Sequence, residues 1–445
     1  MPAQAKKILI LFGDIAILYF SLFVTVYLRY SNVADSTSSN FTTSQLFSIH
    51  VQAFTPLILI WLLVFYIHNL YEITSAKNSL EFYSGLARSL AVNFLAAVLF
   101  FYFANFTYVA PKTNLFIYFG IFSVLFTLWR GQVNIIFKKN LLLKTFIISD
   151  NEKGEKLAVK LNQNPQIGYR VEAVINADSS IGESIKEKKI GALIVDDRFF
   201  SKEGLAVSLY NFIDKIEVIT LDKFNERVWR KINLANVNHI WFLNNIVSGK
   251  RSFYETTKRF FDFILAILLT PILFSLGLLI ILIIKIEGDG PIFYRQIRVG
   301  HKGKNFNLIK FRTMRQDAEK NGAQWTIEND SRVTKVGRFL RKARLDELPQ
   351  LINILKGEMS FVGPRAERPE FHQLLVKEIP FYDRRYLVKP GLTGWAQINY
   401  TYGSSVEDTK EKLSYDFYYL KNRSFIFDVG IILKTANIVL AGLGR

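Results

Sequence analysis

Two adjacent carboxylates, Asp346 and Glu347, are the residues whose types and spacing best suit chemistry. Basic residues flank the pair on both sides in the sequence: Arg338, Arg341, Lys342, Arg344, Lys356 and Arg365. One carboxylate of such a pair could attack phosphorus while the other holds a divalent metal, and arginines would neutralise the phosphate oxygens. The alternative is an acid pair in ordinary salt bridges on a solvated helix. The rest of the sequence favours the chemical interpretation.

The composition places part of the chain in lipid. Its 445 residues leave room for about three domains, and 50% hydrophobic residues with a mean hydropathy of +0.17 are high for a soluble protein. The chain has no cysteine and five histidines, which excludes disulfides and cysteine nucleophiles and favours oxygen ligands for any metal. The net charge of +18 requires an anionic partner. The membrane segments make nucleic acid a weaker candidate than lipid headgroups or phosphorylated small molecules.

The first 140 residues are predicted to form a transmembrane domain. Four apolar runs, at about 8–28, 51–70, 87–106 and 115–137, are each close to the ~20 residues that cross a bilayer as a helix. The first run is too long for a cleavable signal peptide, so the lysines before it should stay on the cytoplasmic side. Four crossings then return the chain to the cytoplasm. Asp14 lies inside the first run, where an ionisable residue suggests function, although we expect it to be paired and structural.

Residues 141–250 are predicted to form a Rossmann-like cytoplasmic domain. Four short apolar segments read as buried strands of a parallel sheet, with helical stretches at 155–162 and 204–214 between them: 145–148, 171–175, 192–195 and 216–219. The turn at 149–154 holds only Gly154, where a dinucleotide-binding turn would carry three glycines. We therefore expect a regulatory or assembly role for this domain, with nucleotide binding left open.

The apolar run at 263–286 decides the topology of residues 251–445. A straight crossing would place a tail with more basic than acidic residues outside the cell, against the usual distribution of positive charge. Pro271 breaks helical hydrogen bonding, and the Thr270 hydroxyl can bond a freed carbonyl and add to the bend. We therefore predict a re-entrant helix that leaves the membrane on the face it entered. After it, the glycine-rich stretch 288–304 predicts a hairpin, followed by residues 306–314.

Seven short motifs follow one another in this part of the chain: Lys258-Arg259 with Asp262, the break at Pro271, Gly290-Pro291 with Arg295-Gln296, 310–314, 345–350, Gly363-Pro364-Arg365, and 389–397. Together they resemble the catalytic region of bacterial polyprenyl-phosphate hexose-1-phosphate transferases, the monotopic phosphoglycosyl transferases of the bacterial sugar transferase family. With the preceding membrane helices and Rossmann-like domain, the whole chain resembles the large form of these enzymes, which starts exopolysaccharide, capsule or O-antigen repeat units. It departs from the family at Ala366, where a second proline is often found.

The resemblance implies an enzyme of the bacterial inner membrane with its catalytic domain on the cytoplasmic face. Such an enzyme transfers a sugar-1-phosphate from a UDP-sugar to undecaprenyl phosphate and releases UMP. Asp346 matches the nucleophile that forms an aspartyl phosphosugar, and Glu347 matches a residue that holds Mg²⁺ together with it. UDP-glucose and UDP-galactose are the expected donors, an N-acetylated sugar stays open, and a homodimer is plausible.

Further site residues are expected around this pair. Arg341 and Arg365 are the first choices for phosphate contacts because planar guanidinium groups match phosphate geometry. Further phosphate contacts are expected from Lys310, Arg312 and Arg385, for which a surface or headgroup-facing charge is the alternative. Asp416 matches a recurrent family acid. At the membrane surface, we expect Lys258 and Arg259 to lie among anionic lipids and Asp262 to pair with one of these two residues.

The amphipathic run at 425–440 can lie in the membrane interface or pack in the core.

Two rival functions are also compatible with the sequence. One is a membrane-anchored, nucleotide-binding regulatory or assembly protein of a polysaccharide system, and the other is a transporter component built on the four helices, whose runs hold few buried polar residues besides Asp14. Only the enzyme requires Asp346 for sugar-phosphate transfer.

Overall fold

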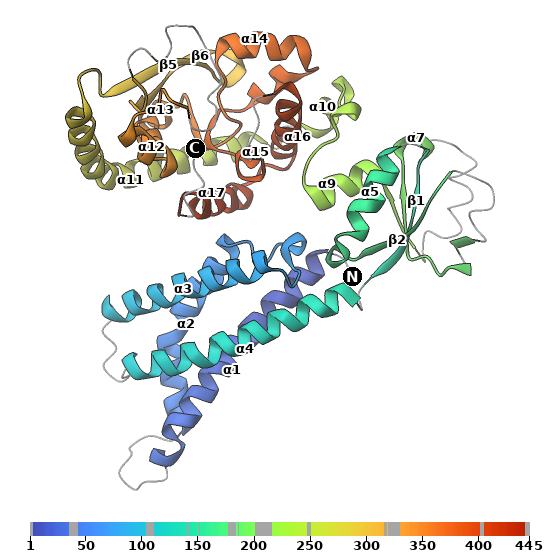
Figure 1. Ribbon diagram of the computed structural model, residues 1–445, viewed down its shortest axis with the longest axis vertical. Coiled ribbons are helices and arrows are strands. Elements are labelled where there is room, and N and C mark those ends of the chain that lie inside the picture. Colours follow the sequence, from blue (N-terminus) through green and yellow to red (C-terminus); the bar gives the residue numbers. More distant parts are fainter. Residues whose placement is uncertain are drawn as a thin grey trace. The chain divides into compact units, whose positions relative to one another are not determined.

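The computed structural model covers the chain in two compact units, Met1–Phe224 and Asn225–Arg445 (Figure 1). The domain boundaries expected near residues 140 and 250 stay predictions. The residues that the structure describes are 3–34, 43–103, 111–139, 142–150, 152–176, 184–185, 187–200, 216–246, 251–315, 318, 330–400 and 405–440.

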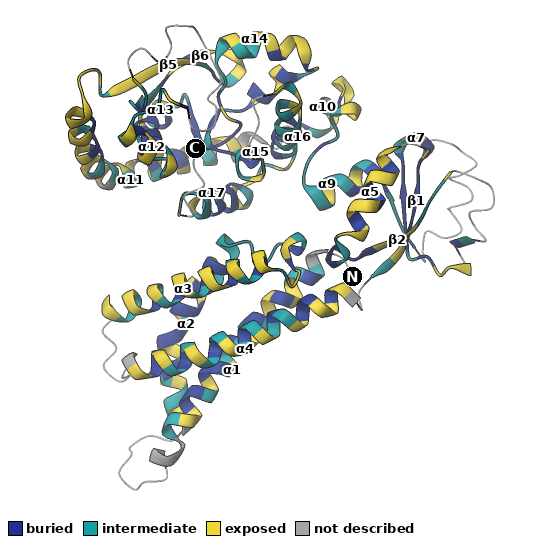
Figure 2. Ribbon diagram, in the orientation of Figure 1, coloured by how far each residue is buried: buried dark blue, intermediate teal, exposed yellow. Residues whose placement is uncertain are grey.

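Four long helices open the first unit: α1 (Ala3–Ala34), α2 (Thr43–Ile67), α3 (Leu80–Phe103) and α4 (Pro111–Lys139). Each contains 24 to 26 residues that are long and apolar enough to cross a membrane, which confirms the four predicted apolar helices. Their outward faces are exposed in Figure 2 and carry large apolar side chains, as Phe12, Leu59 and Phe116 illustrate. Apolar exposure on this scale suits contact with lipid.

Two helix boundaries differ from the sequence expectation. The second helix ends at Ile67 instead of residue 70, because Asn69 takes a positive φ of 60° and the Leu70 N–H turns back to the Phe65 carbonyl, as in a Schellman cap. The third helix begins at Leu80, seven residues before the apolar run. Its first two turns hold polar residues, so hydropathy alone does not reveal them.

Asp14 takes part in a buried cluster inside the helix bundle. Its carboxylate pairs with Arg130 Nη2 at 2.6 Å and accepts a hydrogen bond from Trp129 Nε1 at 3.1 Å, and the two charged side chains are 0% and 2% exposed. Arg130 Nη1 also donates to the Leu70 carbonyl at 2.8 Å. These contacts join α1, α4 and the turn after α2, which is the structural task expected for Asp14.

The rest of the first unit contains a four-stranded parallel sheet in the order β2-β1-β3-β4: β1 (Leu143–Ile148), β2 (Tyr169–Ile175), β3 (Ala192–Val195) and β4 (Glu217–Thr220). The strand positions agree with the sequence prediction, and α5 (Glu152–Asn162) follows β1. The predicted helix at 204–214 lies outside the described residues. A Cβ at Gly154 would lie 2.6 Å from the Ser149 Cβ, so packing alone accounts for the single glycine of this turn.

The second unit begins with α9 (Leu221–Trp229, from Asn225 on) and α10 (His239–Asn245), followed by the long helix α11 (Arg251–Glu287). α11 bends by 57° between Phe253–Pro271 and Leu273–Glu287. The Thr270 hydroxyl donates to the Ala266 carbonyl at 2.7 Å, one residue before the Ile267 carbonyl that Pro271 leaves without an N–H donor. The bend suits a broken span or a re-entrant helix, so the re-entrant path stays a prediction.

The remaining elements surround the acid pair: β5 (Phe293–Val299), β6 (Asn305–Phe311), α12 (Lys335–Lys342), the 3-10 helix η5 (Leu345–Gln350), α13 (Leu351–Lys356), β7 (Ser360–Val362), α14 (Pro369–Glu378), η6 (Tyr382–Leu387), β8 (Gly391–Thr393), α15 (Trp395–Asn399), α16 (Val406–Asn422) and α17 (Phe425–Leu440). β5 and β6 form the predicted antiparallel hairpin. Its turn falls at residues 300–304, and Asn305–Phe311, which follows the glycine-rich stretch, forms the second strand.

Glycines leave no room for side chains where the backbones of β7, β8 and the residues after them meet. The two strands pair in parallel, with Ser360 opposite Gly391 and Val362 opposite Thr393. A Cβ at Gly363 would collide with the Lys389 carbonyl oxygen, and a Cβ at Gly391 or Gly394 would collide with the backbone of Gly363. Only residues without a side chain permit this approach. The glycines of two sequence motifs thereby fix the backbone that leads to Arg365.

The Asp14–Arg130 pair can be tested by removing its charges one at a time. Asp14→Leu leaves Arg130 buried without its partner, so the free energy of unfolding should fall by about 3 kcal/mol or more. Adding Arg130→Met removes the stranded charge and should restore most of the loss. Thermal denaturation in detergent measures both variants. A stable Asp14→Leu protein that has lost activity would contradict the structural role.

Candidate active site

The acid pair lies in η5, between α12 and α13. Arg344 precedes it with a positive φ of 53°, which turns the chain sharply between the two helical segments. The Asp346 and Glu347 side chains point into the fold from the first turn of η5, and both residues are more than nine-tenths buried. Carboxylates at the N-terminal turn of a helix benefit from its dipole, but burial without cations would still be costly.

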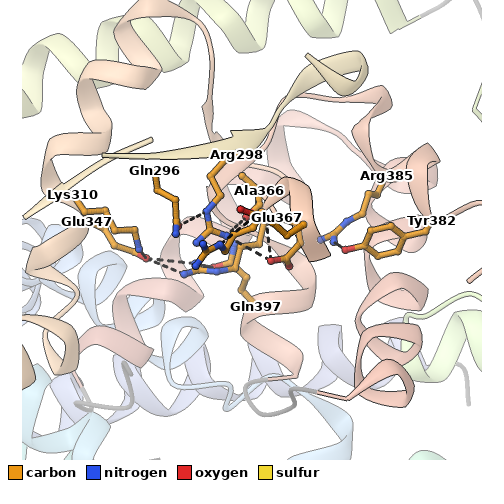
Figure 3. A network of polar contacts seen from close by, with 12 residues as sticks. Gln296, Arg298, Lys310, Glu347, Ala366, Glu367, Tyr382, Arg385 and Gln397 are labelled. Atoms are coloured by element: carbon orange, nitrogen blue, oxygen red, sulfur yellow. Dashed lines mark hydrogen bonds and ion pairs between the residues drawn. The ribbon is translucent and has the colours of Figure 1, made fainter. Parts of the chain in front are cut away.

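Three cations from separate parts of the chain meet Glu347. Lys310 Nζ, on β6, lies 3.0 Å from Oε1 (Figure 3). Arg365 Nη2, on the loop after β7, lies 3.4 Å from the same oxygen. Arg344 Nη1 lies 3.7 Å from Oε2. The structure therefore brings two predicted phosphate ligands, Lys310 and Arg365, to the acid pair.

Asp346 is paired much more weakly than its neighbour. Its one ion-pair contact within the described part of the chain is Lys310 Nζ at 3.9 Å. Burial raises the pKa of Asp346, and the nearby positive charges do not fully offset it. Burial would also raise the pKa of Glu347, but the charges of Lys310, Arg365 and Arg344 outweigh it and hold that pKa well below its usual range. The pKa values of the two adjacent carboxyl groups are thus shifted in opposite directions.

The other predicted phosphate ligands are placed differently. Arg341 donates from Nε to the Thr313 hydroxyl at 2.9 Å, and its charge acts on Asp346. Arg312 instead donates to the Gly288 and Asp289 carbonyls at 2.9 and 2.8 Å, beyond the C-terminal end of α11. Arg312 therefore secures the exit of this helix, and its described contacts do not reach the acid pair.

Arg385 and Asp416 form a separate buried pair. Arg385 Nη2 lies 2.7 Å from Asp416 Oδ2, and Arg385 Nη1 donates to the Tyr382 hydroxyl at 2.5 Å. Both side chains are under 8% exposed, and Figure 3 shows Arg385 and Tyr382 beside the network around Glu347, without a drawn contact to it. The described contacts hold η6 against α16 and do not bring Arg385 or Asp416 to the acid pair.

The polar side chains at the start of α11 bond other parts of the protein, and the expected contact of Lys258 and Arg259 with anionic lipids stays a prediction. Lys258 pairs with Asp428 at 2.7 Å, and Arg259 donates to the Ile354 and Leu355 carbonyls at 2.5 and 2.7 Å, so their head groups bond protein. The Asp262 carboxylate accepts the Phe361 N–H at 3.2 Å. Asp262 is therefore bonded to β7, and Lys258 and Arg259 tie α11 to α17 and α13. These partners lie 95 to 170 residues away in the sequence.

Two residues that sequence reasoning gave no role support the site. The Gln397 side-chain oxygen accepts from Arg365 at 3.4 Å and from Arg344 at 3.5 Å. Arg298, on β5, donates to the Ala366 carbonyl at 2.9 Å and lies 3.6 Å from Glu367 Oε1 (Figure 3). Both hold the segment that carries Arg365. Gln397 closes a recognised motif, whereas no local pattern signals the contacts of Arg298.

The donor set suits a magnesium ion that binds together with substrate. The described residues contain no group of three or more His, Cys, Asp or Glu side chains placed to hold a metal. Asp346 and Glu347 remain as two neighbouring carboxylates. Mg²⁺ commonly takes one or two carboxylates, several waters and substrate phosphates, so this pair fits such an ion.

Comparison with known proteins places these elements in a family. The model of the bacterial sugar transferase family matches residues 253–442, which include every element that contacts the acid pair. A UDP-glucose:undecaprenyl-phosphate glucose-1-phosphate transferase of Caulobacter vibrioides is 40% identical over 188 residues, which are 42% of this chain and 70% of that protein. The chain belongs to the bacterial sugar transferase family.

Two further relatives of this bacterial sugar transferase differ in the sugar that their names give. A UDP-N-acetylgalactosamine-undecaprenyl-phosphate N-acetylgalactosaminephosphotransferase of Aeromonas hydrophila is 44% identical over 191 residues, 43% of this chain and 45% of that protein. A UDP-glucose:undecaprenyl-phosphate glucose-1-phosphate transferase of Xanthomonas campestris is 40% identical over 192 residues, 42% of this chain and 40% of that protein. The matches therefore span less than half of these two relatives.

The unequal pairing of the two carboxylates predicts opposite effects on stability. Glu347→Gln leaves Lys310 and Arg365 without their anion, so the melting temperature of the purified protein should fall by roughly 5 °C or more. Asp346→Asn removes a charge that burial already disfavours, so the melting temperature should stay the same or rise. Thermal denaturation without substrate compares the two variants. A larger loss for Asp346→Asn would contradict the assigned pairing.

Proposed function

We propose that this protein transfers a sugar-1-phosphate from a UDP-sugar to undecaprenyl phosphate and releases UMP. The observation that carries the proposal is the unequal pairing of the two carboxylates. Glu347 is held by Lys310 and Arg365, whereas the one ion-pair contact of Asp346 within the described residues is Lys310 at 3.9 Å. A carboxylate with few fixed partners, beside cations that can donate hydrogen bonds to phosphate oxygens, is suited to attack phosphorus.

In the proposed first step, an Asp346 carboxylate oxygen bonds to the β-phosphorus of the donor. The bond from that phosphorus to the bridging oxygen breaks, and UMP leaves with the bonding electrons. In the second step, a phosphate oxygen of the lipid attacks the same phosphorus, and the bond to Asp346 breaks to regenerate the carboxylate. Two in-line displacements replace one difficult transfer, and the two bulky substrates need not be present together.

The cations around Glu347 supply the phosphate-binding charge in this scheme. Lys310 and Arg365 are positioned by Glu347 within 3.4 Å before substrate arrives, so their reorganisation on binding is small. Arg341 adds positive charge near Asp346 from α12. Asp346 and Glu347 would also hold Mg²⁺, which when bound would neutralise charge on the diphosphate.

The membrane location follows from the acceptor. Undecaprenyl phosphate keeps its phosphate at headgroup level, so the nucleophile must be held there too. In this proposal α11 enters from the cytoplasmic side of the bacterial inner membrane and returns to it, and the reaction is the first membrane step of exopolysaccharide, capsule or O-antigen synthesis. The names of the relatives favour glucose or N-acetylgalactosamine as the sugar to test alongside galactose.

UMP release from purified protein tests the reaction. We expect release from one of UDP-glucose, UDP-galactose and UDP-N-acetylgalactosamine with Mg²⁺ and undecaprenyl phosphate. Asp346→Asn should lower the rate at least about 1,000-fold because it removes the nucleophile. Arg312→Gln is the matched control, since Arg312 contacts the exit of α11 and should retain most of the activity.

Release that persists in Asp346→Asn would contradict the role of Asp346. No release from any donor by a preparation shown to be folded would contradict the enzyme itself. That second result would favour a membrane-anchored regulatory or assembly protein.

A further inference from the structure

A small basic cavity lies in the second unit, beside the first half of α11. The space open to the centres of water-sized atoms is about 30 Å³. The cavity is surrounded by α11, β7, the end of η6 and the end of α16. Its charged lining residues are four basic and two acidic side chains: Lys258, Arg259, Lys389, Arg423, Glu255 and Asp262. The excess of positive charge indicates a place for an anion.

Arg423 carries two hydrogen-bond donors at this cavity that bond no described residue. Its side chain is 8% exposed, and its Nη2 pairs with Glu255 Oε1 at 3.1 Å. The Nε and Nη1 atoms are buried and bond no other described residue. Buried charged donors are costly to leave without an acceptor. Arg423 connects α16 to α17, so its backbone is fixed from both sides.

Lys389 adds a second available cation. No described residue forms an ion pair with it, and burial together with the charge of Arg259 lowers its pKa. Lys258 and Arg259 are already bonded to Asp428 and to carbonyls, but their charges remain at the cavity wall. An anion with several acceptor oxygens would satisfy Arg423 and Lys389 at once. A phosphate group has this form, and its oxygen centres fit within the cavity volume.

Exposed apolar side chains on α11, which lines the cavity, and on α17, which begins two residues after Arg423, suggest what carries the phosphate. Phe260 and Phe261 on α11 are 60% and 45% exposed, and Phe425 and Ile426 on α17 are 43% and 84% exposed. The rings of Phe261 and Phe425 are 4.5 Å apart, so the two helices present one apolar surface. A phosphate joined to acyl chains would place its charge in the cavity and its chains against this surface.

The cavity is separate from the acid pair. Arg259, on its wall, bonds the carbonyls of Ile354 and Leu355 at the end of α13. Glu347 precedes these two residues by seven and eight positions, on the path through η5 and α13. No described hydrogen bond or ion pair joins a residue that lines this cavity to Asp346 or Glu347.

We propose that this cavity binds the phosphate of a membrane lipid and thereby docks the start of α11 and α17 onto the bilayer surface. The proposal does not depend on the reaction at Asp346. Failure of UMP release would leave it standing, and loss of lipid binding would not contradict the transfer reaction.

Native mass spectrometry of the full chain, stripped of lipid in neutral detergent, tests the proposal with dimyristoylphosphatidylglycerol as the probe. Arg423→Gln with Lys389→Gln should weaken binding at least about tenfold. The matched control is Lys377→Gln with Arg384→Gln, which removes the same charges from exposed positions and should bind as the parent does. Dimyristoylglycerol, with the same chains and no phosphate, should bind equally to all three proteins.

A second arm separates a lipid phosphate from a free one. Inorganic phosphate in millimolar excess should not displace the lipid; displacement would identify a site for a soluble anion and overturn the lipid assignment. Equal lipid binding by the Arg423 and Lys389 variant and the control would overturn the site. If the double variant does not fold, Lys389→Gln alone should still fold, because this partly buried side chain forms no described ion pair. It should weaken lipid binding, and unchanged binding would contradict the proposal.

Discussion

The burial of the Glu347 carboxylate is the constraint on which the catalytic unit depends. A carboxylate more than nine-tenths buried must be matched by cations, and here they come from β6, from the turn before η5 and from the loop after β7. The hairpin, η5 and β7 must therefore be held in register with one another. Once they are, Asp346 is fixed beside a cluster of positive charges that pairs mainly with Glu347.

Backbone packing around this cluster serves the same end. The glycines at 363, 391 and 394 let the backbones at β7 and β8 meet without side chains between them. Arg365 follows Gly363 by two residues. Arg298 and Gln397 then hold the segment that carries Arg365. The start of α11 is tied to the same core through Arg259 and Asp262, so a helix expected to meet lipid is continuous with the site. The chemistry and the membrane attachment thus share one scaffold.

Local patterns predicted much of this arrangement. The apolar runs gave the four long helices, the short apolar segments gave the strands of the parallel sheet, and the motifs led to Asp346, Glu347, Lys310 and Arg365. Long-range side-chain partners could not be predicted. Lys258 bonds Asp428 170 residues away, and Arg385 bonds Asp416 from another helix. The spacing of residues in a sequence shows which side chains share one face of a helix or strand. Pairs between distant residues depend instead on how separate elements pack together.

Trapping the covalent intermediate tests the central claim most directly. The protein is incubated with its UDP-sugar and Mg²⁺ without undecaprenyl phosphate, digested, and analysed by peptide mass spectrometry. The account predicts the mass of one sugar phosphate on the peptide that contains Asp346, assigned by fragmentation to Asp346 and not to Glu347, and its loss when the lipid acceptor is added. An adduct on Glu347, or UMP release and lipid product without any adduct on Asp346, would contradict it.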